Sequence, residues 1–498
     1  MSRKLFACAV VLAAFAGACG SRSQDAKSVV NDAARTLGAA DVNSIQYSGT
    51  GFAYAFGQNS RPTDPWPKFY ARYSRVVDYQ KGLAKEDMVR TQFENPPRGG
   101  GSQPIYTEAR STTFVGPDSA WDAGALALTP HGWVKAAMAA SPTVATTTVD
   151  GKPVTVVSFT TNGKYKVDGQ LNSDKLLERV ETLMPDPVLG DMPVEVTFFD
   201  YKDFGGVKFP MRIVQKYNGF PMLELNVKQV QPNVPASIQL PGAELGRTAG
   251  APPPSNVQSH RIADGVWYLD STTDATSSNA NSVAVEFKDY AVIIESSVSE
   301  ERALANIAEV KKLVPNKPIR YHVNSHHHGD HAGGMRTYIA EGVTVITNEK
   351  NKDFYEQVVL GRPRTLEPDR LSQNPKPADF IWMKDKYVLT DGNRSVEIYP
   401  VLGNGHAEYL LMSYLPKEKL LVITDVFNLF GEVRPNTPPP GIATPYYASL
   451  AENIKRLKLD VRQIAASHGH GKAVVPVSEL WKQVEGTVQA PEIRPLAD

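Results

Sequence analysis

The fold of the carboxy-terminal half is decided by one stretch of sequence, HHHGDHAGG at residues 326–334. Only 10 histidines occur in 498 residues, and four of them lie in the first six positions of this stretch, which makes a chance His-rich turn the weaker interpretation. Residues 318–324 predict a buried strand, and the turn and Gly-Gly helix start behind it would gather polar side chains around one point. Imidazole and carboxylate together suit Zn²⁺ and similar cations. The candidate metal ligands in this stretch are His326, His328, Asp330 and His331.

Three further candidate ligands each follow directly after a predicted strand: His406, Asp425 and His468. Each one alone has an ordinary interpretation, because a histidine after glycine is common in loops and a strand-end aspartate often caps the next helix. Together they predict one site, since α/β proteins build their sites where strands end. His470 is an alternative to His468, which we favour because it comes first after its strand. His322 is interpreted as a core strand residue, and His327 as a packing residue or a group that supports a ligand.

The order of these ligands resembles that of the metallo-β-lactamase-fold hydrolase superfamily, over roughly residues 260–480. The resemblance implies an αββα sandwich, so the expected fold class is α/β, preceded by a mainly antiparallel β domain. It implies two Zn²⁺ ions per chain. One ion would be held by His326, His328 and His406, the other by Asp330, His331 and His468, with Asp425 bridging the two. Glu295 stands where the family usually has a strand-end aspartate, and we interpret it as a residue that orients the ligand loop from behind the metal ligands.

The chemistry that this resemblance implies is hydrolysis of a small-molecule substrate. Three imidazoles leave a tetrahedral zinc one open position, and two cations about 3.5–4 Å apart can share a hydroxide that attacks a carbonyl carbon. Asp330 is the predicted catalytic residue, because its carboxylate can orient the nucleophile and carry its proton to the leaving group. The expected bond is an ester, lactone, amide or β-lactam bond.

Two alternatives remain open at this point. One is a mononuclear iron enzyme of the same fold that oxidises sulfur compounds, with His326, His406 and Asp425 as its ligands. That interpretation leaves most of the other candidate ligands without a role. The second alternative is a carrier that binds an apolar ligand through its amino-terminal half.

Composition narrows the possible partners. Lys and Arg number 53, as do Asp and Glu, so the formal net charge is zero and nothing indicates binding to nucleic acid. The two cysteines, Cys8 and Cys19, both lie near the start of the chain. We therefore expect a mature chain without disulfides or thiolate ligands, which excludes β-lactamases that use a Cys ligand. The oligomeric state stays open.

Residues 1–24 are predicted to be a signal peptide or lipobox with a short tether. Basic residues at positions 3–4 precede an apolar run, residues 5–15, that is too short to span a bilayer. Ala-Gly-Ala at residues 16–18 fits ordinary signal cleavage, and in front of Cys19 it also resembles a bacterial lipobox. We expect an exported protein, in the periplasm or anchored in the outer membrane of a bacterium through a lipidated Cys19.

Residues 25–240 are predicted to form a mainly β domain that resembles the curved sheets of bacterial lipoprotein carriers. Alternating strands with Asp-Gly and Asn-Gly turns predict an antiparallel meander, with helices at 26–37 and 129–140. His131 is interpreted as structural. We interpret this domain as an accessory one. Its role stays open among a spacer, a dimerisation surface, a substrate-gathering module and a plain packing domain. A linker rich in Pro, Gly and Ala, 241–258, precedes the catalytic domain, 259–498.

Overall fold

The computed structural model describes residues 25–116, 124–149, 151–240, 257–270, 281–295, 298–429, 433–469 and 474–496. The predicted signal and tether, most of the predicted linker and His470 lie outside the described residues. Among the helices of the described part, none combines the length and the apolar character that crossing a membrane requires.

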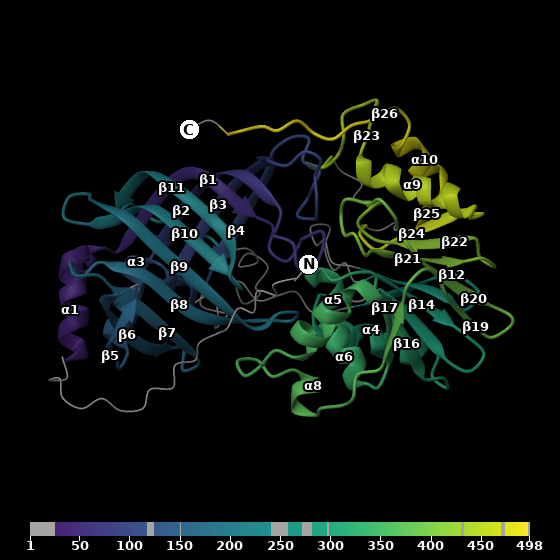
Figure 1. Ribbon diagram of the computed structural model, residues 1–498, viewed down its shortest axis with the longest axis horizontal. Coiled ribbons are helices and arrows are strands. Elements are labelled where there is room, and N and C mark those ends of the chain that lie inside the picture. The colour runs from purple at the N-terminus through teal and green to yellow at the C-terminus, as the bar shows by residue number, and fades with distance from the viewer. Residues whose placement is uncertain are drawn as a thin grey trace.

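The amino-terminal half is one antiparallel sheet, which confirms the predicted meander (Figure 1). Its order is β4-β3-β2-β1-β11-β10-β9-β8-β7-β6-β5, so the last strand returns to pair with the first. The bounds are β1 (Ser44–Tyr54), β2 (Lys68–Asp78), β3 (Leu83–Gln92), β4 (Ala109–Val115), β5 (Thr143–Val149), β6 (Lys152–Thr161), β7 (Tyr165–Leu171), β8 (Leu177–Asp186), β9 (Gly190–Asp203), β10 (Lys208–Tyr217) and β11 (Phe220–Pro232). The return of β11 to β1 brings the loop after β1 close to the β10–β11 turn.

Two helices pack against this sheet. Helix α1 (Ala26–Leu37) starts at the side chain of Asp25, which accepts a hydrogen bond from the Lys27 N–H, and ends at Gly38 with φ of 67°. Helix α3 (Pro130–Ala139) has proline in its first turn and is capped by the hydroxyl of Thr129. Both helices bury their apolar faces in a core that is continuous with the sheet.

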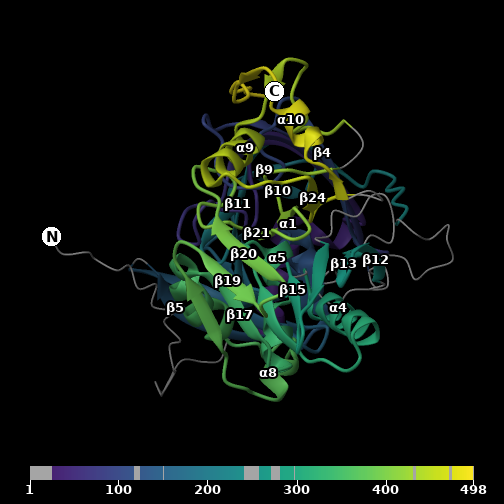
Figure 2. The same cartoon turned by 90° about the vertical axis from the view of Figure 1, so that its right-hand side faces the viewer.

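The carboxy-terminal half is a sandwich of two sheets with helices outside, the predicted αββα arrangement. One sheet has the order β12-β13-β14-β15-β16-β17-β18 and the other β19-β20-β21-β22-β24-β25. One core lies between the sheets, a second under α4 and α6 and a third under α9 and α10. Figure 2 shows α4 beyond β13 and β15, away from β19 and β20.

The strands of this half are β12 (Gln258–Ala263), β13 (Val266–Asp270), β14 (Ser282–Glu286), β15 (Ala291–Ile294), β16 (Ile319–Val323), β17 (Thr344–Asn348), β18 (Phe380–Met383), β19 (Tyr387–Thr390), β20 (Ser395–Pro400), β21 (Leu411–Leu415), β22 (Leu420–Ile423), β23 (Ile442–Ala443), β24 (Gln463–Ala466), β25 (Val474–Pro476) and β26 (Thr487–Val488). The helices are α4 (Glu300–Leu313), α5 (Gly329–Ala332), α6 (Met335–Ala340), α7 (Lys352–Phe354), α8 (Arg370–Gln373), α9 (Pro445–Leu457) and α10 (Ser478–Gln483).

The two halves are packed together. A single hydrophobic cluster contains residues of the amino-terminal sheet together with apolar residues of α6 and of the segment after α7. The segment 361–378 contacts the sheet, where Arg362 Nη1 donates to Asn218 Oδ1 over 2.6 Å and the Asp191 N–H donates to the Pro363 carbonyl over 2.8 Å. The carboxy-terminal tail returns along β3 of the sheet (Figure 1).

Candidate metal centre

The predicted ligands come together where strands of both sheets end. The hexapeptide follows β16, which runs parallel to β15, and continues into the short helix α5. Asp425 follows β22 and His468 follows β24, and these two strands are also parallel neighbours. Because the carboxyl ends of parallel strands share one edge, loops that are far apart in sequence converge on one point.

Two acidic residues at these strand ends have a backbone conformation that is unusual for their type. Glu295 directly follows β15 with φ of 71°, and Asp425 lies near the end of β22 with φ of 58°. Left-handed φ values in residues other than glycine store strain of about 1–3 kcal/mol and are concentrated at functional sites. Both side chains are buried and turn into the cluster of histidines.

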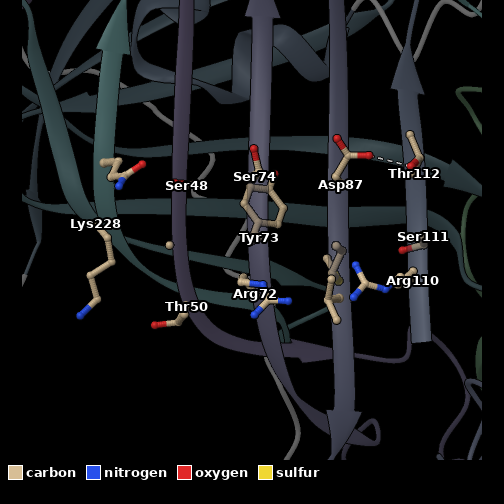
Figure 3. A pocket seen from close by; sticks show the side chains of 14 residues that line it. Ser48, Thr50, Arg72, Tyr73, Ser74, Asp87, Arg110, Ser111, Thr112 and Lys228 are labelled. Atoms are coloured by element: carbon tan, nitrogen blue, oxygen red, sulfur yellow. Dashed lines mark hydrogen bonds between the residues drawn. The ribbon is translucent and has the colours of Figure 1, made fainter. Parts of the chain in front are cut away.

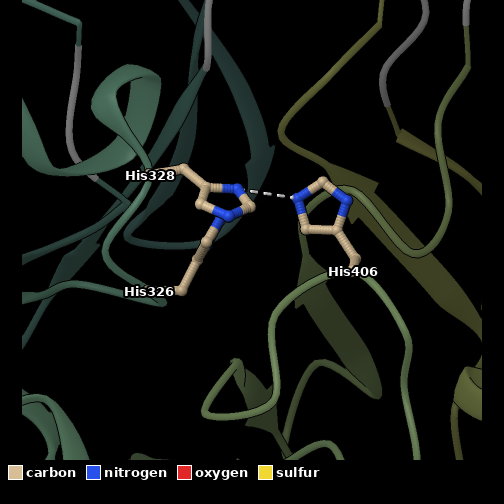
Figure 4. A group of neighbouring side chains, drawn as sticks. All are labelled: His326, His328 and His406. Carbon is tan, nitrogen blue, oxygen red and sulfur yellow. Dashed lines mark hydrogen bonds between the residues drawn. The ribbon is translucent and has the colours of Figure 1, made fainter. Parts of the chain in front are cut away.

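The first ligand group consists of His326, His328 and His406, whose ligand atoms all lie within 4.8 Å of one another (Figure 4). The His406 Nε2 is 3.0 Å from the His328 Nδ1. The outward nitrogens are already used: Ser325 Oγ lies 2.9 Å from His326 Nδ1, and His328 Nε2 donates to the Asn59 carbonyl over 2.8 Å. That donation leaves the lone pair of His328 on Nδ1, which faces the group. His326 Nε2 is buried and has no hydrogen-bond partner among the described residues.

The second ligand group consists of Asp330, His331, Asp425 and His468, again within 4.8 Å of one another. Glu295 Oε2 accepts a hydrogen bond from His331 Nδ1 over 2.5 Å, so His331 presents Nε2 to the group. That Nε2 lies 3.2 Å from His468 Nε2 and 3.3 Å from Asp330 Oδ2. Glu295 therefore orients one ring of the group from behind.

Asp425 faces both groups. Its Oδ1 lies 3.4 Å from His406 Nε2 and 3.2 Å from His468 Nε2. Its Oδ2 lies 3.5 Å from His326 Nε2 and 3.1 Å from His331 Nε2. Ligand atoms about 2.1 Å from a tetrahedral zinc stand about 3.4 Å apart. The spacing of the buried nitrogens and oxygens, together with the unpartnered His326 Nε2, fits two adjacent cations that share one carboxylate.

Comparison with known proteins finds a family match in the carboxy-terminal half. Residues 275–470 match the model of the metallo-beta-lactamase superfamily. The carboxy-terminal half is a metallo-β-lactamase domain. Similar solved structures include the metallo-beta-lactamase from Pontibacter korlensis, at 19% identity and a TM-score of 0.34 over 46% of this chain and 97% of that chain. The metallo-beta-lactamase FIM-1 from Pseudomonas aeruginosa, in its mono-zinc form, is 17% identical, with a TM-score of 0.34 over 46% of this chain and 95% of that chain. None of the curated proteins matches the chain.

The superfamily indicates a metal-dependent hydrolase, and the charges of the metallo-β-lactamase domain fit a cation site. Burial lowers the pKa of His326, His328 and His406, so these rings are neutral and have a free lone pair. Burial also opposes protonation of His468, but Asp425 and Asp330 outweigh it and raise the pKa of His468 to about 9. Without a metal, protons on imidazole therefore balance the carboxylates, and a cation can replace those protons.

The other histidines of this region lie around the cluster rather than in it. His327 turns to the amino-terminal half, where its Nε2 is 3.2 Å from Asn59 Oδ1. His322 is buried in β16, with Nδ1 3.2 Å from the Ile293 carbonyl and its ring stacked on Tyr338. The structure thus brings together all seven predicted ligands.

Residues of the amino-terminal half also reach the metal centre, and sequence analysis missed them. Gln58 Nε2 donates to Asp330 Oδ1 over 3.2 Å. The neighbouring loop passes so close that a Cβ on Gly100 would lie 1.9 Å from Gln58 Oε1 and 2.9 Å from His406 Cε1. No local sequence pattern marks Gln58 or Asn59. The only signal is the glycine triplet 99–101, which indicates that backbone approaches something closely.

Proposed function

We propose that this protein is a dinuclear zinc hydrolase that cleaves an ester, lactone, amide or β-lactam bond of a small molecule. The observation that carries the proposal is the position of Asp425 between two ligand groups, which supports two adjacent cations rather than one. Two Zn²⁺ ions held there would polarise a substrate carbonyl and lower the pKa of water enough to supply a nucleophile near neutral pH.

Asp330 is the residue that we assign to proton transfer. Its side chain is 30% exposed, whereas that of Asp425 is 9% exposed, so Asp330 is the more accessible of these two carboxylates. Gln58 holds its Oδ1, and Oδ2 lies 3.4 Å from His468 Nε2. Burial opposes ionisation of Asp330, but His331 and His468 outweigh it and hold the pKa well below its usual range. Asp330 is therefore ionised at neutral pH, which is the state in which a carboxylate can accept a proton and pass it to the leaving group.

The proposal is tested by measuring metal content and activity of the full chain, purified without added metal. We expect about two zinc ions per chain and hydrolysis of at least one member of a panel of lactones, esters, thioesters, amides and β-lactams. A chelator should remove both the metal and the activity, and added zinc should restore both.

Two results would contradict the proposal. About one iron per chain, with oxidation of sulfur compounds, would favour the mononuclear iron enzyme. Little metal and no uptake on dialysis against zinc would exclude both metalloenzymes and would favour a carrier.

A further inference from the structure

The metal centre opens into a polar pocket of about 240 Å³ between the two halves of the molecule. Asp330, His406 and His468 line it from the metallo-β-lactamase domain, and Gln58 and Gly100 line it from the amino-terminal half. The amino-terminal half therefore forms one wall of the proposed active site.

A second and larger cavity, of about 480 Å³, begins on the other side of Gln58 and Asp330, and both residues line the two cavities. Its walls are largely apolar. Trp66 is the central ring, 4.9 Å from the ring of Phe56 and 5.4 Å from that of Phe220. Val188, Leu189 and Phe354 are among the other lining residues. The volume falls within the range of small-molecule sites, which are typically apolar with a few placed polar groups.

The loop between β1 and β2, which carries Phe56 and Trp66, is attached to the metallo-β-lactamase domain by its own backbone. The Asn59 carbonyl accepts the hydrogen bond from His328 Nε2, and the Ser60 carbonyl accepts one from the Glu408 N–H over 2.9 Å. The Asn59 side chain also donates to the Asp64 carbonyl and so holds the loop in shape. The cavity is therefore preformed, and its position is tied to a candidate metal ligand.

A third hollow in the same half has a different character. A groove of about 590 Å³ crosses β11, β1, β2, β3 and β4 (Figure 3). It is lined mainly by polar and charged side chains such as Arg72, Arg110 and Asp87. Among its lining residues, none also lines either cavity at the metal centre. The apolar cavity, unlike this groove, therefore adjoins the metal centre.

We propose that the apolar cavity binds an aromatic or branched aliphatic group of the substrate, next to the bond that is cleaved. This inference rests on the proposed hydrolase function. The amino-terminal half then contributes to substrate recognition. Among the roles that the sequence left open, this is the substrate-gathering one. Gln58 is a positioning residue at the boundary of the two cavities, because it fixes Asp330 while the apolar group lies on its other side.

The test compares two hydroxamic acids that share a metal-binding group and differ by a phenyl ring. Acetohydroxamic acid and phenylacetohydroxamic acid are titrated calorimetrically into the zinc-loaded full chain. Burial of the ring should make the phenyl compound bind roughly tenfold to a hundredfold more tightly.

Two variants alter the cavity in opposite ways. Phe220→Ala removes part of the wall, and Val298→Trp fills the cavity from a side chain that is 36% exposed, so that the new ring need not disturb a core. In each variant the phenyl compound should bind less than roughly threefold more tightly than acetohydroxamic acid, because the phenyl ring no longer fits the cavity. Phe199→Ala, on β9 and outside the cavity lining, is the matched control and should keep the full ratio.

Three outcomes would overturn the inference in distinguishable ways. Equal affinities in the unaltered protein, or a ratio that survives both cavity variants, would place the phenyl ring elsewhere while leaving the metal centre intact. Failure of both hydroxamates to bind would instead remove the hydrolase function on which the inference rests. Binding of phenylacetamide to metal-stripped protein, as tight as that of phenylacetohydroxamate to the zinc form, would show a carrier site.

Discussion

His131 and His468, two buried histidines from different halves of the molecule, have opposite charge states. In the amino-terminal sheet, burial lowers the pKa of His131 to about 4, and only the Leu37 carbonyl opposes that effect among its nearest polar groups. In the metallo-β-lactamase domain, burial acts on His468 in the same direction, yet Asp425 and Asp330 raise its pKa to about 9. Burial alone neutralises a histidine. Carboxylates that contact a buried histidine keep its ring protonated, and at such a site a metal cation can replace the proton.

The comparison holds within the metallo-β-lactamase domain as well. His322 is buried four residues before the ligand hexapeptide, and burial lowers its pKa to about 3. It stacks on Tyr338 and does not take part in either ligand group. Position in the domain is therefore not what distinguishes His468; contact with two carboxylates is, Asp425 at 3.2 Å and Asp330 at 3.4 Å. The predictions below test that distinction, beginning with Asp425.

Asp425→Ala should produce the largest effect, because the Asp425 carboxylate lies within 3.5 Å of histidines from both ligand groups. We expect loss of most bound zinc and a fall in kcat/KM of roughly three orders of magnitude or more. Metal analysis and steady-state kinetics measure both. Asp391→Asn, at a surface turn, is the control. A variant that retained two zinc ions and its activity would contradict the bridging role.

The charge on His468 predicts how metal uptake depends on pH. Its pKa of about 9 and the raised pKa of His331 mean that both rings are protonated at pH 7 in the metal-free protein. Binding of zinc must release these protons, so affinity should rise with pH, by up to roughly a hundredfold per unit while two protons are displaced. Calorimetry in buffers of different ionisation enthalpy counts the protons. A heat of binding that is independent of the buffer would disprove the charge assignment.

The fold class and the grouping of the candidate ligands were predictable because their signals are local. Four candidate ligands lie within residues 326–331, and the others come shortly after apolar strands, so a short window of sequence contains each piece. The αββα sandwich and the antiparallel sheet are both confirmed. The contacts of Gln58 and Asn59 were not predictable, since they join residues about 270 positions apart through the packing of two halves.

An Asp-Gly pair inside a strand is difficult to interpret from sequence alone, and β7 shows why. Asp168-Gly169 is a typical turn pair, yet it lies inside this strand. The reason is tertiary: a Cβ on Gly169 would lie 2.2 Å from the ring of Trp133, so glycine is required where the indole packs on the strand. Before the position of Trp133 is known, the pair indicates a turn.

Glu295→Gln should have a smaller effect than loss of Asp425, because Glu295 acts on the centre only through His331. Glutamine keeps the size of the side chain but removes the charge that accepts the proton of His331 Nδ1. We expect zinc affinity to fall by roughly ten- to a hundredfold. Competition with a chromogenic chelator measures this affinity. Glu295→Asp, the residue usual in the family, should restore much of it, and an unchanged affinity in the Gln variant would show that orientation by Glu295 is not needed.

His131→Gln should have the smallest effect, confined to acid stability. The folded-state pKa of about 4 lies below the unfolded value of about 6.5, so the unfolded chain binds the proton more readily. The free energy of unfolding is therefore fully retained above pH 6.5 and is lost as pH falls toward 4. Glutamine can still donate to the Leu37 carbonyl, which lies 3.2 Å from His131 Nε2, but it does not titrate.

Urea unfolding at pH 7 and pH 5 provides the measurement for His131. The unaltered protein should lose about 2 kcal/mol more than the His131→Gln variant between these two pH values, because the native state cannot take up the proton that the unfolded chain binds. Equal losses would mean that His131 is protonated in the folded sheet. The contrast with His468 would then arise from something other than the carboxylates, since burial alone would not have neutralised a histidine in this protein.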